Sequence, residues 1–243
     1  MFDKGQAEQV PDDQLSRSDG RVWYIPHHGV YHKKKHKIRV VFDCAASFQG
    51  TSLNLQLLQG PDLTNTLLGG ILRFRQEPVA IMADIEGMFH QVRVPENYAD
   101  FSRFLWWPHG NVDQPLVEYR MVVHLFGAVS SPSCANYALK RTAIDNEGQV
   151  DRDVLNTIRN NFYVDDCLKS VTSDRQAIRM VSELRAACAT GGFKPPVAHA
   201  TRRGLCLQTN LKRLRNICLP IVASIVCEYS IDCLWLQATQ PTK

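Results

Sequence analysis

Several features that assign a chain to a broad class of protein are absent from this sequence. It contains no apolar stretch of 18 residues, so no membrane-spanning helix is expected. Its polar first residues, Met1 to Gly5, do not resemble a signal peptide. Its eight cysteines include no C-x-x-C pair and no spacing typical of a zinc site, which favours an intracellular protein with reduced thiols. Four of them are expected to act as small buried hydrophobes: Cys44, Cys134, Cys167 and Cys188.

What the chain does contain is enough apolar material to build a core. Hydrophobic residues make up 44% of the 243 residues, which argues against wholesale disorder. The length leaves room for one large domain or two small ones. The 28 basic and 24 acidic side chains give a formal net charge of +4, and such a mild basic excess is by itself weak support for a nucleic-acid partner.

The hydrophobic pattern predicts an α+β fold with helices packed on a mainly antiparallel sheet. Alternation of Ile38, Val40 and Phe42 is typical of a half-buried strand. The run from Val79 to Ile85 is almost wholly apolar and predicts a buried central strand. Two further strands are expected within residues 91–107 and 117–126.

Three helices are predicted from their capping signals. Asp62 is expected to cap a helix that ends before Pro78. Ser131-Pro132 is typical of a helix start, with proline at the first helical position. Ser173 to Gln176 resembles a capping box, and its helix should end at Gly191-Gly192. The apolar face of this last helix should contain Ile178, Val181, Leu184 and Cys188.

The most informative segment is Phe162–Asp166, termed the acidic hairpin. Asp165 and Asp166 lie between an apolar run and Cys167, a pattern typical of two short strands joined by an acidic turn. Adjacent carboxylates repel one another, so the turn is costly unless a cation neutralises it. Oxygen ligands suit Mg²⁺, which typically uses one or two carboxylates plus substrate phosphates. An exposed turn without a ligand is the alternative.

Asp84 is the candidate third carboxylate. It interrupts an apolar strand, where an unpaired carboxylate is expensive. The alternative is a strand-end aspartate that caps the following Glu86-Gly87 turn. One strand-borne aspartate and a two-aspartate hairpin, brought together on a sheet, would form a two-metal site of the kind used for phosphoryl transfer.

The segments around these aspartates follow one another in a recognisable order. They are Trp23–Val30, Lys37–Asp43, Ser52–Asn54, Ala83–Val92, Phe126-Gly127, Ser131–Ser133, Tyr163–Asp166 and Gly191–Phe193. In this order and spacing they resemble the motifs of reverse transcriptases, and specifically the polymerase of BEL/Pao-type long-terminal-repeat retrotransposons. The resemblance covers about residues 20–194. It rests on the order and spacing of all these motifs together rather than on any single motif.

The resemblance implies the fingers and palm of a right-hand polymerase, with the thumb missing. It implies an RNA-directed DNA polymerase that adds deoxynucleotides from deoxynucleoside triphosphates to a primer on an RNA or DNA template. Asp84 and Asp165 would hold two Mg²⁺ ions, and Asp166 would support the same cluster. No membrane partner is implied, the family-based location is cytoplasmic, and the oligomeric state is left open.

Four further residues match positions that contact the nucleotide in this family. Phe89 would be an aromatic steric gate against a ribose 2′-hydroxyl, although an ordinary core aromatic is the alternative. Lys37 and Arg39 would bind the triphosphate, with a solvated strand face as the alternative. Gly127 would allow the backbone to approach the nucleotide or template closely.

The pattern departs from the family after Phe193. A lysine is expected soon afterwards, usually before a tryptophan, and Lys194 comes early. No primer-grip motif follows, and the thumb, connection and RNase H parts have no counterpart in these residues. We therefore expect a loose polar segment over 1–20, a reverse transcriptase domain over 21–194 and an atypical tail over 195–243.

The abrupt loss of pattern suggests that this tail arises from a shifted reading frame, a faulty splice model or decay of the element. The alternative functions are a catalytically inactive remnant that at most binds nucleic acid, and an interaction domain whose acidic hairpin is incidental. The ordered motif set argues against the interaction domain.

Overall fold

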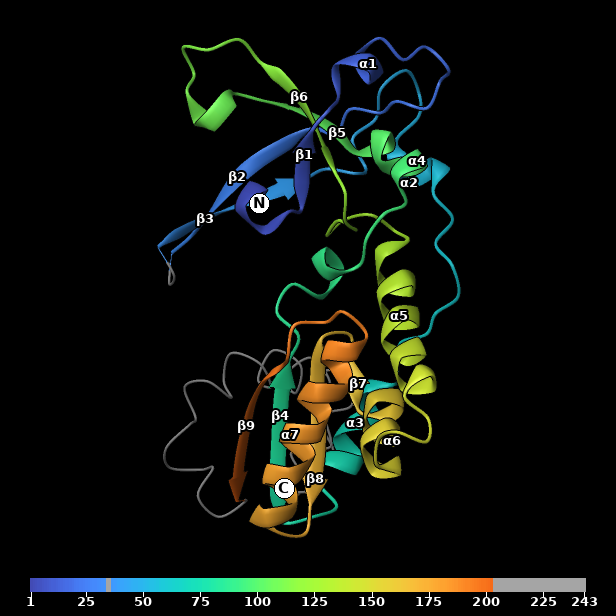
Figure 1. Ribbon diagram of the computed structural model, residues 1–243, viewed down its shortest axis with the longest axis vertical. Helices are drawn as coiled ribbons and strands as arrows, with labels where there is room; N and C mark the ends of the chain where they lie inside the picture. Colours follow the sequence, from blue (N-terminus) through green and yellow to red (C-terminus); the bar gives the residue numbers. More distant parts are fainter. Residues whose placement is uncertain (34–35, 203–243) are drawn as a thin grey trace, which may run out of the picture.

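Two lobes lie one above the other along the long axis of the computed structural model, which describes residues 1–33 and 36–202 (Figure 1). The upper lobe contains a three-stranded antiparallel sheet, in the order β1-β6-β5, and a separate β2–β3 hairpin. Its strands are β1 (Ala7–Gln9), β2 (His27–His32), β3 (Lys37–Phe42), β5 (Arg103–Trp106) and β6 (Val117–Met121). Short helical turns join them: η1 (Phe2–Lys4), α1 (Asp12–Leu15), α2 (Leu53–Gln56), α4 (Glu96–Ala99), η3 (Asp100–Ser102) and η4 (Pro108–Gly110).

The lower lobe is built on a four-stranded antiparallel sheet in the order β7-β8-β4-β9. Its strands are β4 (Val79–Asp84), β7 (Phe162–Tyr163), β8 (Asp166–Val171) and β9 (Val197–Arg202). The longer helices of the molecule belong here: α3 (Leu67–Phe74), α5 (Ser131–Asp145), α6 (Arg152–Asn160) and α7 (Asp174–Thr190). The turn η2 (Met88–Gln91) follows β4. The predicted central strand is therefore confirmed, since β4 lies between β8 and β9.

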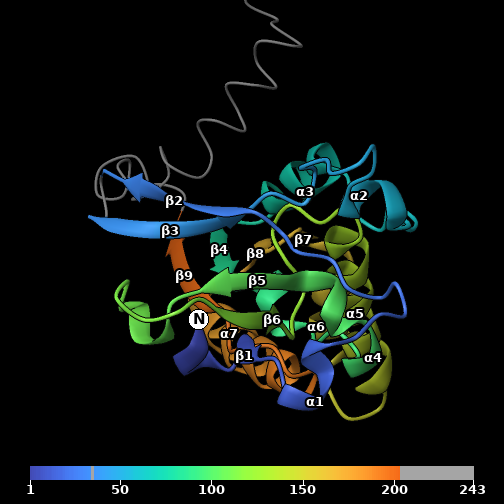
Figure 2. The same ribbon diagram turned by 90° about the horizontal axis from the view of Figure 1, so that it is seen from above.

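Alternation along β4 separates a covered face of the lower sheet from a second face. Ile81 and Ala83 are buried in one hydrophobic core with residues of α5, α6 and α7. On β8, Cys167 pairs with Ala83 and belongs to the same core. Met82 and Asp84 alternate with these residues and therefore face the other side of the sheet. The second core lies in the upper lobe, and Figure 2 shows the two sets of strands from above.

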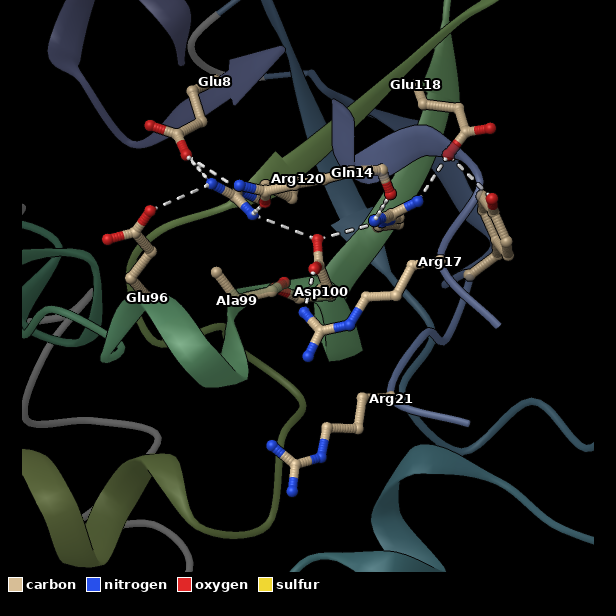
Figure 3. Close-up of polar contacts among 12 residues, drawn as sticks. Glu8, Gln14, Arg17, Arg21, Glu96, Ala99, Asp100, Glu118 and Arg120 are labelled. Carbon is tan, nitrogen blue, oxygen red and sulfur yellow. Dashed lines mark hydrogen bonds and ion pairs between the residues drawn. The ribbon is translucent and has the colours of Figure 1, made fainter. Parts of the chain in front are cut away.

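The N-terminal segment is an ordered part of the upper lobe, so the expectation that residues 1–20 are loosely held is wrong. β1 pairs with β6 at the edge of the sheet, and Ala7 and Val10 are buried. Arg17 donates a hydrogen bond to the buried Asp100 over 2.7 Å, and Glu8 pairs with Arg120 over 2.7 Å (Figure 3). This largely polar segment is held by strand pairing, by two buried apolar side chains and by ion pairs.

Regular structure continues past Phe193, where the sequence pattern of the family is lost. Residues Val197–Arg202 form β9, whose register places Val197 opposite Asp84 on β4. The sheet that contains Asp84 therefore extends into the segment predicted to be atypical. The rest of that segment, residues 203–243, lies outside the described residues.

Several local predictions need correction. The first predicted helix begins at Leu67 with Thr66 at its N-cap, because Asp62 instead accepts a hydrogen bond from the Thr64 amide in a turn. Ser173 caps α7 as predicted, yet Ile178 is 73% exposed and lies off the buried face. That face contains Ala177, Met180, Leu184, Ala187 and Cys188.

The structure differs from the predictions in two further ways: the exposure of β3 and the presence of an additional helix. Ile38 and Val40 are exposed, because no other element of the described residues pairs with the two-stranded β2–β3 hairpin to which they belong. Helix α6 was not predicted, although Asp151 caps it and Val154, Leu155 and Ile158 are buried at helical spacing.

The cysteines behave largely as predicted. Cys44, Cys167 and Cys188 are buried, whereas Cys134 is only partly covered, and all four thiols are free. Burial raises the pKa of the Cys44 thiol to about 11 and that of Cys188 to about 12. Within residues 1–33 and 36–202, no helix combines the length and apolar composition needed to cross a bilayer.

Candidate active site

The acidic hairpin forms a tight two-residue turn between β7 and β8. Tyr163 pairs with Asp166, so Val164 and Asp165 make up the turn. Val164 has a φ of 57°, which is rare for a β-branched residue and typically costs about 1–3 kcal/mol. Asn161 closes the base of the hairpin, because its side-chain amide donates to the Leu168 carbonyl over 2.7 Å. Strain of this kind, held by surrounding contacts, often marks a functional site.

The structure brings all three predicted carboxylates to one end of the lower sheet. Asp84 on β4 lies directly opposite Asp166 on β8, and both side chains are on the same face. Directly opposed residues in an antiparallel pair have Cβ atoms about 4.5–5.5 Å apart. The Ile85 amide donates to the Asp165 carbonyl over 3.0 Å, which fixes the turn beside the end of β4. Residues 82 positions apart in sequence therefore share one strand end.

These carboxylates lie on the face opposite the one that packs against α5, α6 and α7. Asp84, Asp165 and Asp166 are all partly buried. On the same face, Met82 pairs with Leu168 on β8 and with His199 on β9. The covered face packs against α5, α6 and α7, so the sheet supports the carboxylates from behind while leaving them accessible from the other side.

Burial and mutual repulsion make negative charge costly at this end of the sheet. Burial raises the pKa of Asp165 above its ordinary value. Burial raises the pKa of Asp166 to about 6, with further contributions from the charges of Asp165 and Asp84. Among the described residues, no basic side chain offsets the shift at Asp165 or Asp166. A bound cation would relieve this repulsion and lower both pKa values.

The donor set fits a magnesium ion in chemical type. Within the described part of the chain, no group of three or more His, Cys, Asp or Glu side chains forms a metal site. Magnesium commonly binds one or two carboxylates and completes its shell with water and substrate phosphates. The three aspartates supply only oxygen atoms as ligands, and oxygen is the ligand type that Mg²⁺ prefers over the sulfur of cysteine or the nitrogen of histidine.

An aromatic pair lies just beyond β4. Phe89 is in η2 and is 9% exposed, while Phe126 is 48% exposed. Their ring centroids are 4.6 Å apart, and the His90 ring meets Phe126 edge-on at 5.0 Å. Phe89 belongs to the lower core together with Ile85. The predicted gate residue therefore follows Asp84 by five residues in the chain and packs in the core that contains Ile85, but it is largely covered.

Gly127 has a conformation and surroundings that suit only glycine. Its φ is 102°, and a Cβ atom built there would lie 3.2 Å from the Phe42 carbonyl oxygen. The Asn54 amide holds this segment on both sides: it donates to the Gly127 carbonyl over 2.9 Å and accepts from the Val129 amide over 3.0 Å. Asn54, in α2, thereby links that helix to the chain that leads into α5.

The two predicted triphosphate-binding residues lie on the upper lobe. Arg39 is exposed on β3 opposite Val30, and Lys37 begins the same strand opposite His32. The acidic hairpin belongs to the sheet of the lower lobe, so the structure does not join these cations to it (Figure 1).

Gln91 is a polar link that the sequence did not reveal. Its side chain donates to the Glu86 carbonyl over 2.6 Å and accepts from the Lys194 amide over 2.5 Å. It therefore ties the turn after Asp84 to the chain after α7. Both Gln91 and Asn54 fall inside recognised motifs, but a one-residue amide bridge leaves no periodic signal in a sequence.

Neither of two surface hollows lies at the acidic hairpin. One of about 670 Å³ is in the upper lobe, and one of about 420 Å³ lies between α7 and β9. The first is lined by Asp13, Gln14, Ser16, Arg17, Glu96 and Asn97.

Comparisons with known proteins identify the type of fold. No family model matches the chain, and no curated protein matches it. Among solved structures, the chain is similar to a foamy viral protease-reverse transcriptase dRH in complex with double-stranded DNA, with a TM-score of 0.57 and 13% identity. The match covers 79% of this chain and 28% of that chain, so the chain spans less than a third of the length of this neighbour. The described residues therefore have a reverse-transcriptase-like fold of helices and antiparallel sheet.

Proposed function

We propose that the chain is the fingers and palm part of a reverse transcriptase, of the BEL/Pao retrotransposon type, that transfers deoxynucleotides to a primer 3′-hydroxyl. The observation that carries the proposal is the pairing of Asp84 with Asp166 beside a turn that contains Asp165. The similarity to a foamy viral reverse transcriptase supports it at the level of the fold. The ordered motifs of the sequence support the subtype.

In this proposal the three aspartates hold two Mg²⁺ ions. When bound, the metal supplies Lewis-acid chemistry that activates the attacking hydroxyl and neutralises the leaving pyrophosphate. Asp84 and Asp165 are the ligands, and Asp166 adds negative charge to the same strand end. The raised pKa of Asp166, about 6, fits a carboxylate that is ionised at neutral pH but gains from a nearby cation.

The remaining residues would position the other reactants. Lys37 and Arg39 would neutralise triphosphate charge from the upper lobe, which requires the two lobes to approach one another around the nucleotide. The exposed backbone of Gly127 would contact the nucleotide or the template, with Asn54 holding its carbonyl. An RNA or DNA template with its primer is the partner that this arrangement implies.

Primer extension on an RNA template with Mg²⁺ tests the activity. The chain is compared with Asp165→Asn and with the matched control Asp113→Asn, an aspartate in an exposed turn of the upper lobe. We expect Asp165→Asn to lose incorporation by about 10³-fold or more, because several kcal/mol of charge stabilisation depend on the metal. We expect Asp113→Asn to behave like the natural chain. Equal incorporation by Asp165→Asn and the natural chain would reject metal catalysis at the hairpin.

Binding of Mn²⁺, measured by electron paramagnetic resonance, gives a readout that does not depend on turnover. The natural chain should bind the ion more tightly than Asp165→Asn does. Metal binding and retained affinity for a primer–template duplex, without incorporation, would favour the inactive remnant. If the natural chain and Asp165→Asn bind Mn²⁺ equally tightly, the proposed metal site at Asp165 is rejected.

A further inference from the structure

The backbone ladder between β4 and β9 stops at the strand end that carries Asp84. The last residue pair of this ladder is Asp84 with Val197. The two residues that precede Val197 are Pro195 and Pro196. A proline has no amide hydrogen, so neither residue can donate to a carbonyl of the chain that leaves β4. On this side, the connection past Asp84 must therefore come from something other than strand pairing.

The side chain of Gln91 supplies that connection. It donates to the Glu86 carbonyl over 2.6 Å and accepts from the Lys194 amide over 2.5 Å. If the register of β4 and β9 continued, Lys194 would lie opposite Gly87, the residue after Glu86. A glutamine side chain carries one amide with both donor and acceptor groups, as a peptide unit does. Gln91 therefore serves as an inserted peptide group that joins the two chains past the prolines.

This bridge completes a clamp on the end of β4. On the β8 side, the Ile85 amide donates to the Asp165 carbonyl over 3.0 Å. On the β9 side, the bridge through Gln91 holds the turn that follows Asp84. Gln91 is only partly buried, and both of its partners are exposed. Loss of the bridge should therefore displace the turn after Asp84 more than it disturbs the hydrophobic core.

We propose that Gln91 is a positioning residue for the metal site, because it keeps Asp84 in place relative to Asp165 and Asp166. This inference rests on the proposed function, which assigns two metal ions to these aspartates. Gln91 acts through the backbone of the turn and does not itself contact the metal. Ligands work only within about 0.5 Å of their productive geometry, and groups that orient them typically contribute about 10–100-fold to metal affinity or activity.

The test compares the Mn²⁺ affinity of Gln91→Met, Gln91→Asn, Gln176→Met and the natural chain by electron paramagnetic resonance. Gln91→Met keeps the length of the side chain but removes its donor and acceptor. Gln91→Asn keeps the amide on a shorter side chain, which cannot reach both partners. Gln176→Met is the matched control, because Gln176 accepts from the Thr172 amide over 3.2 Å. That contact follows Val171, which pairs with Val79 at the opposite end of β4 from the aspartates.

We expect Gln91→Met to bind Mn²⁺ about 10-fold more weakly than the natural chain, and Gln91→Asn to show a smaller loss. Gln176→Met should bind the ion as the natural chain does. An unchanged affinity in Gln91→Met would overturn the proposal, and so would an equal loss in Gln176→Met. If Gln91→Met does not fold, an unchanged affinity in Gln91→Asn overturns it. Near-ultraviolet circular dichroism of each variant verifies that its fold is intact.

Amide hydrogen exchange in the metal-free chain tests the clamp itself. In Gln91→Met, the amides of Lys194 and Ile85 should both exchange faster, because one loses its acceptor and the other lies beside the released turn. Gln176→Met should leave both rates unchanged. An Ile85 amide that exchanges equally slowly in Gln91→Met and the natural chain would contradict the clamp, since the hairpin side alone would then hold the end of β4.

Primer extension separates this inference from the proposed function. A natural chain that binds Mn²⁺ more tightly than Asp165→Asn does, but incorporates no nucleotide, rejects the activity and leaves the role of Gln91 measurable by metal affinity. A natural chain that incorporates deoxynucleotides, with the same metal affinity and incorporation in Gln91→Met, supports the function and rejects this role of Gln91. Equal Mn²⁺ binding by the natural chain and Asp165→Asn would reject the two together.

Discussion

The two lobes differ in the charged groups that surround their partly or fully buried carboxylates. In the upper lobe, Asp100 is 0% exposed and accepts hydrogen bonds from three arginines, Arg17, Arg103 and Arg120 (Figure 3). In the lower lobe, Asp165 and Asp166 adjoin another carboxylate, and no basic side chain of the described residues offsets their raised pKa values.

The pKa shifts have opposite signs for this reason. Burial by itself opposes ionisation of Asp100, but the hydrogen bonds from Arg103, Arg17 and Arg120 outweigh it and lower the pKa. At Asp166, burial and the neighbouring carboxylates act in the same direction and raise the pKa to about 6. The first cluster is complete within the chain and stabilises the fold. At the second, the carboxylates of Asp165 and Asp166 adjoin like charge, and the proposed function assigns their neutralisation to a bound cation.

Removing the charge of Asp100 should have the largest effect on stability. In Asp100→Asn, Arg103 and Arg120 stay buried while losing a shared negative partner. Breaking a buried ion pair in this way costs about 3–5 kcal/mol. We expect a loss of about 3 kcal/mol or more in urea unfolding followed by circular dichroism, because Glu118 and Glu8 still compensate part of the positive charge.

An exposed aspartate provides the matched control for this experiment. Asp145 pairs with Arg141 one helical turn away, and both side chains are more than half exposed. Asp145→Asn should change the free energy of unfolding by less than about 0.5 kcal/mol. A loss in Asp100→Asn no greater than in Asp145→Asn would mean that the buried network contributes nothing to stability.

The equivalent change in the lower lobe should have the opposite sign. Because the folded pKa of Asp166 lies at about 6, above an unfolded value of about 3.9, the native state binds the proton more tightly. The free energy of unfolding therefore falls as the pH rises from about 4 to 6, and it stays low above that window. In Asp166→Asn this contribution to the fall in the free energy of unfolding should be absent, because asparagine does not titrate. Since Asp166 is partly exposed, we expect the variant to be about 1–2 kcal/mol more stable at about pH 7.5 without divalent ions.

Thermal unfolding across this pH range, with and without Mg²⁺, measures the difference. The two chains should converge in stability below about pH 3, because Asp166 is then neutral in both the folded and the unfolded state. Mg²⁺ should stabilise the natural chain by mass action and should stabilise Asp166→Asn less. A variant that is less stable than the natural chain at about pH 7.5 without metal would show that the charge of Asp166 already has a partner.

The lower lobe is the part that the sequence predicted well, because its signals are local. The apolar run that became β4, the start of α5, the cap of α7 and the acidic hairpin were each predicted from residues a few positions apart in the chain. The cap predicted at Ser131 is wrong, since Ser130 is the N-cap of α5 and makes no side-chain cap hydrogen bond. Asp84 was linked to the hairpin by the order of the motifs, because the register that places it opposite Asp166 cannot be derived from either strand alone.

The upper lobe was predicted less well, because its contacts join distant polar residues. Glu8, Arg17, Asp100 and Arg120 come from four separate segments, and each alone is typical of an exposed position. Nothing in the local pattern shows that Arg103 and Arg120 on neighbouring strands both turn toward a buried carboxylate. For a similar reason, exposure of Phe126 over Phe89 could not be predicted, since it depends on how the two cores meet.

The smallest expected effect concerns the outer member of the buried network. Arg17 is 25% exposed at its side chain and donates to Asp100 over 2.7 Å, so Arg17→Ala should destabilise the fold less than the loss of a fully buried charged hydrogen bond would. Because one lowering contact is lost, the pKa of Asp100 should rise, and acid unfolding should begin at a higher pH. Arg21→Ala is the control, since Figure 3 shows no contact between Arg21 and Asp100. If Arg17→Ala unfolds at the same pH as Arg21→Ala, two arginines suffice for Asp100, and the N-terminal segment must be held by β1 rather than by charge.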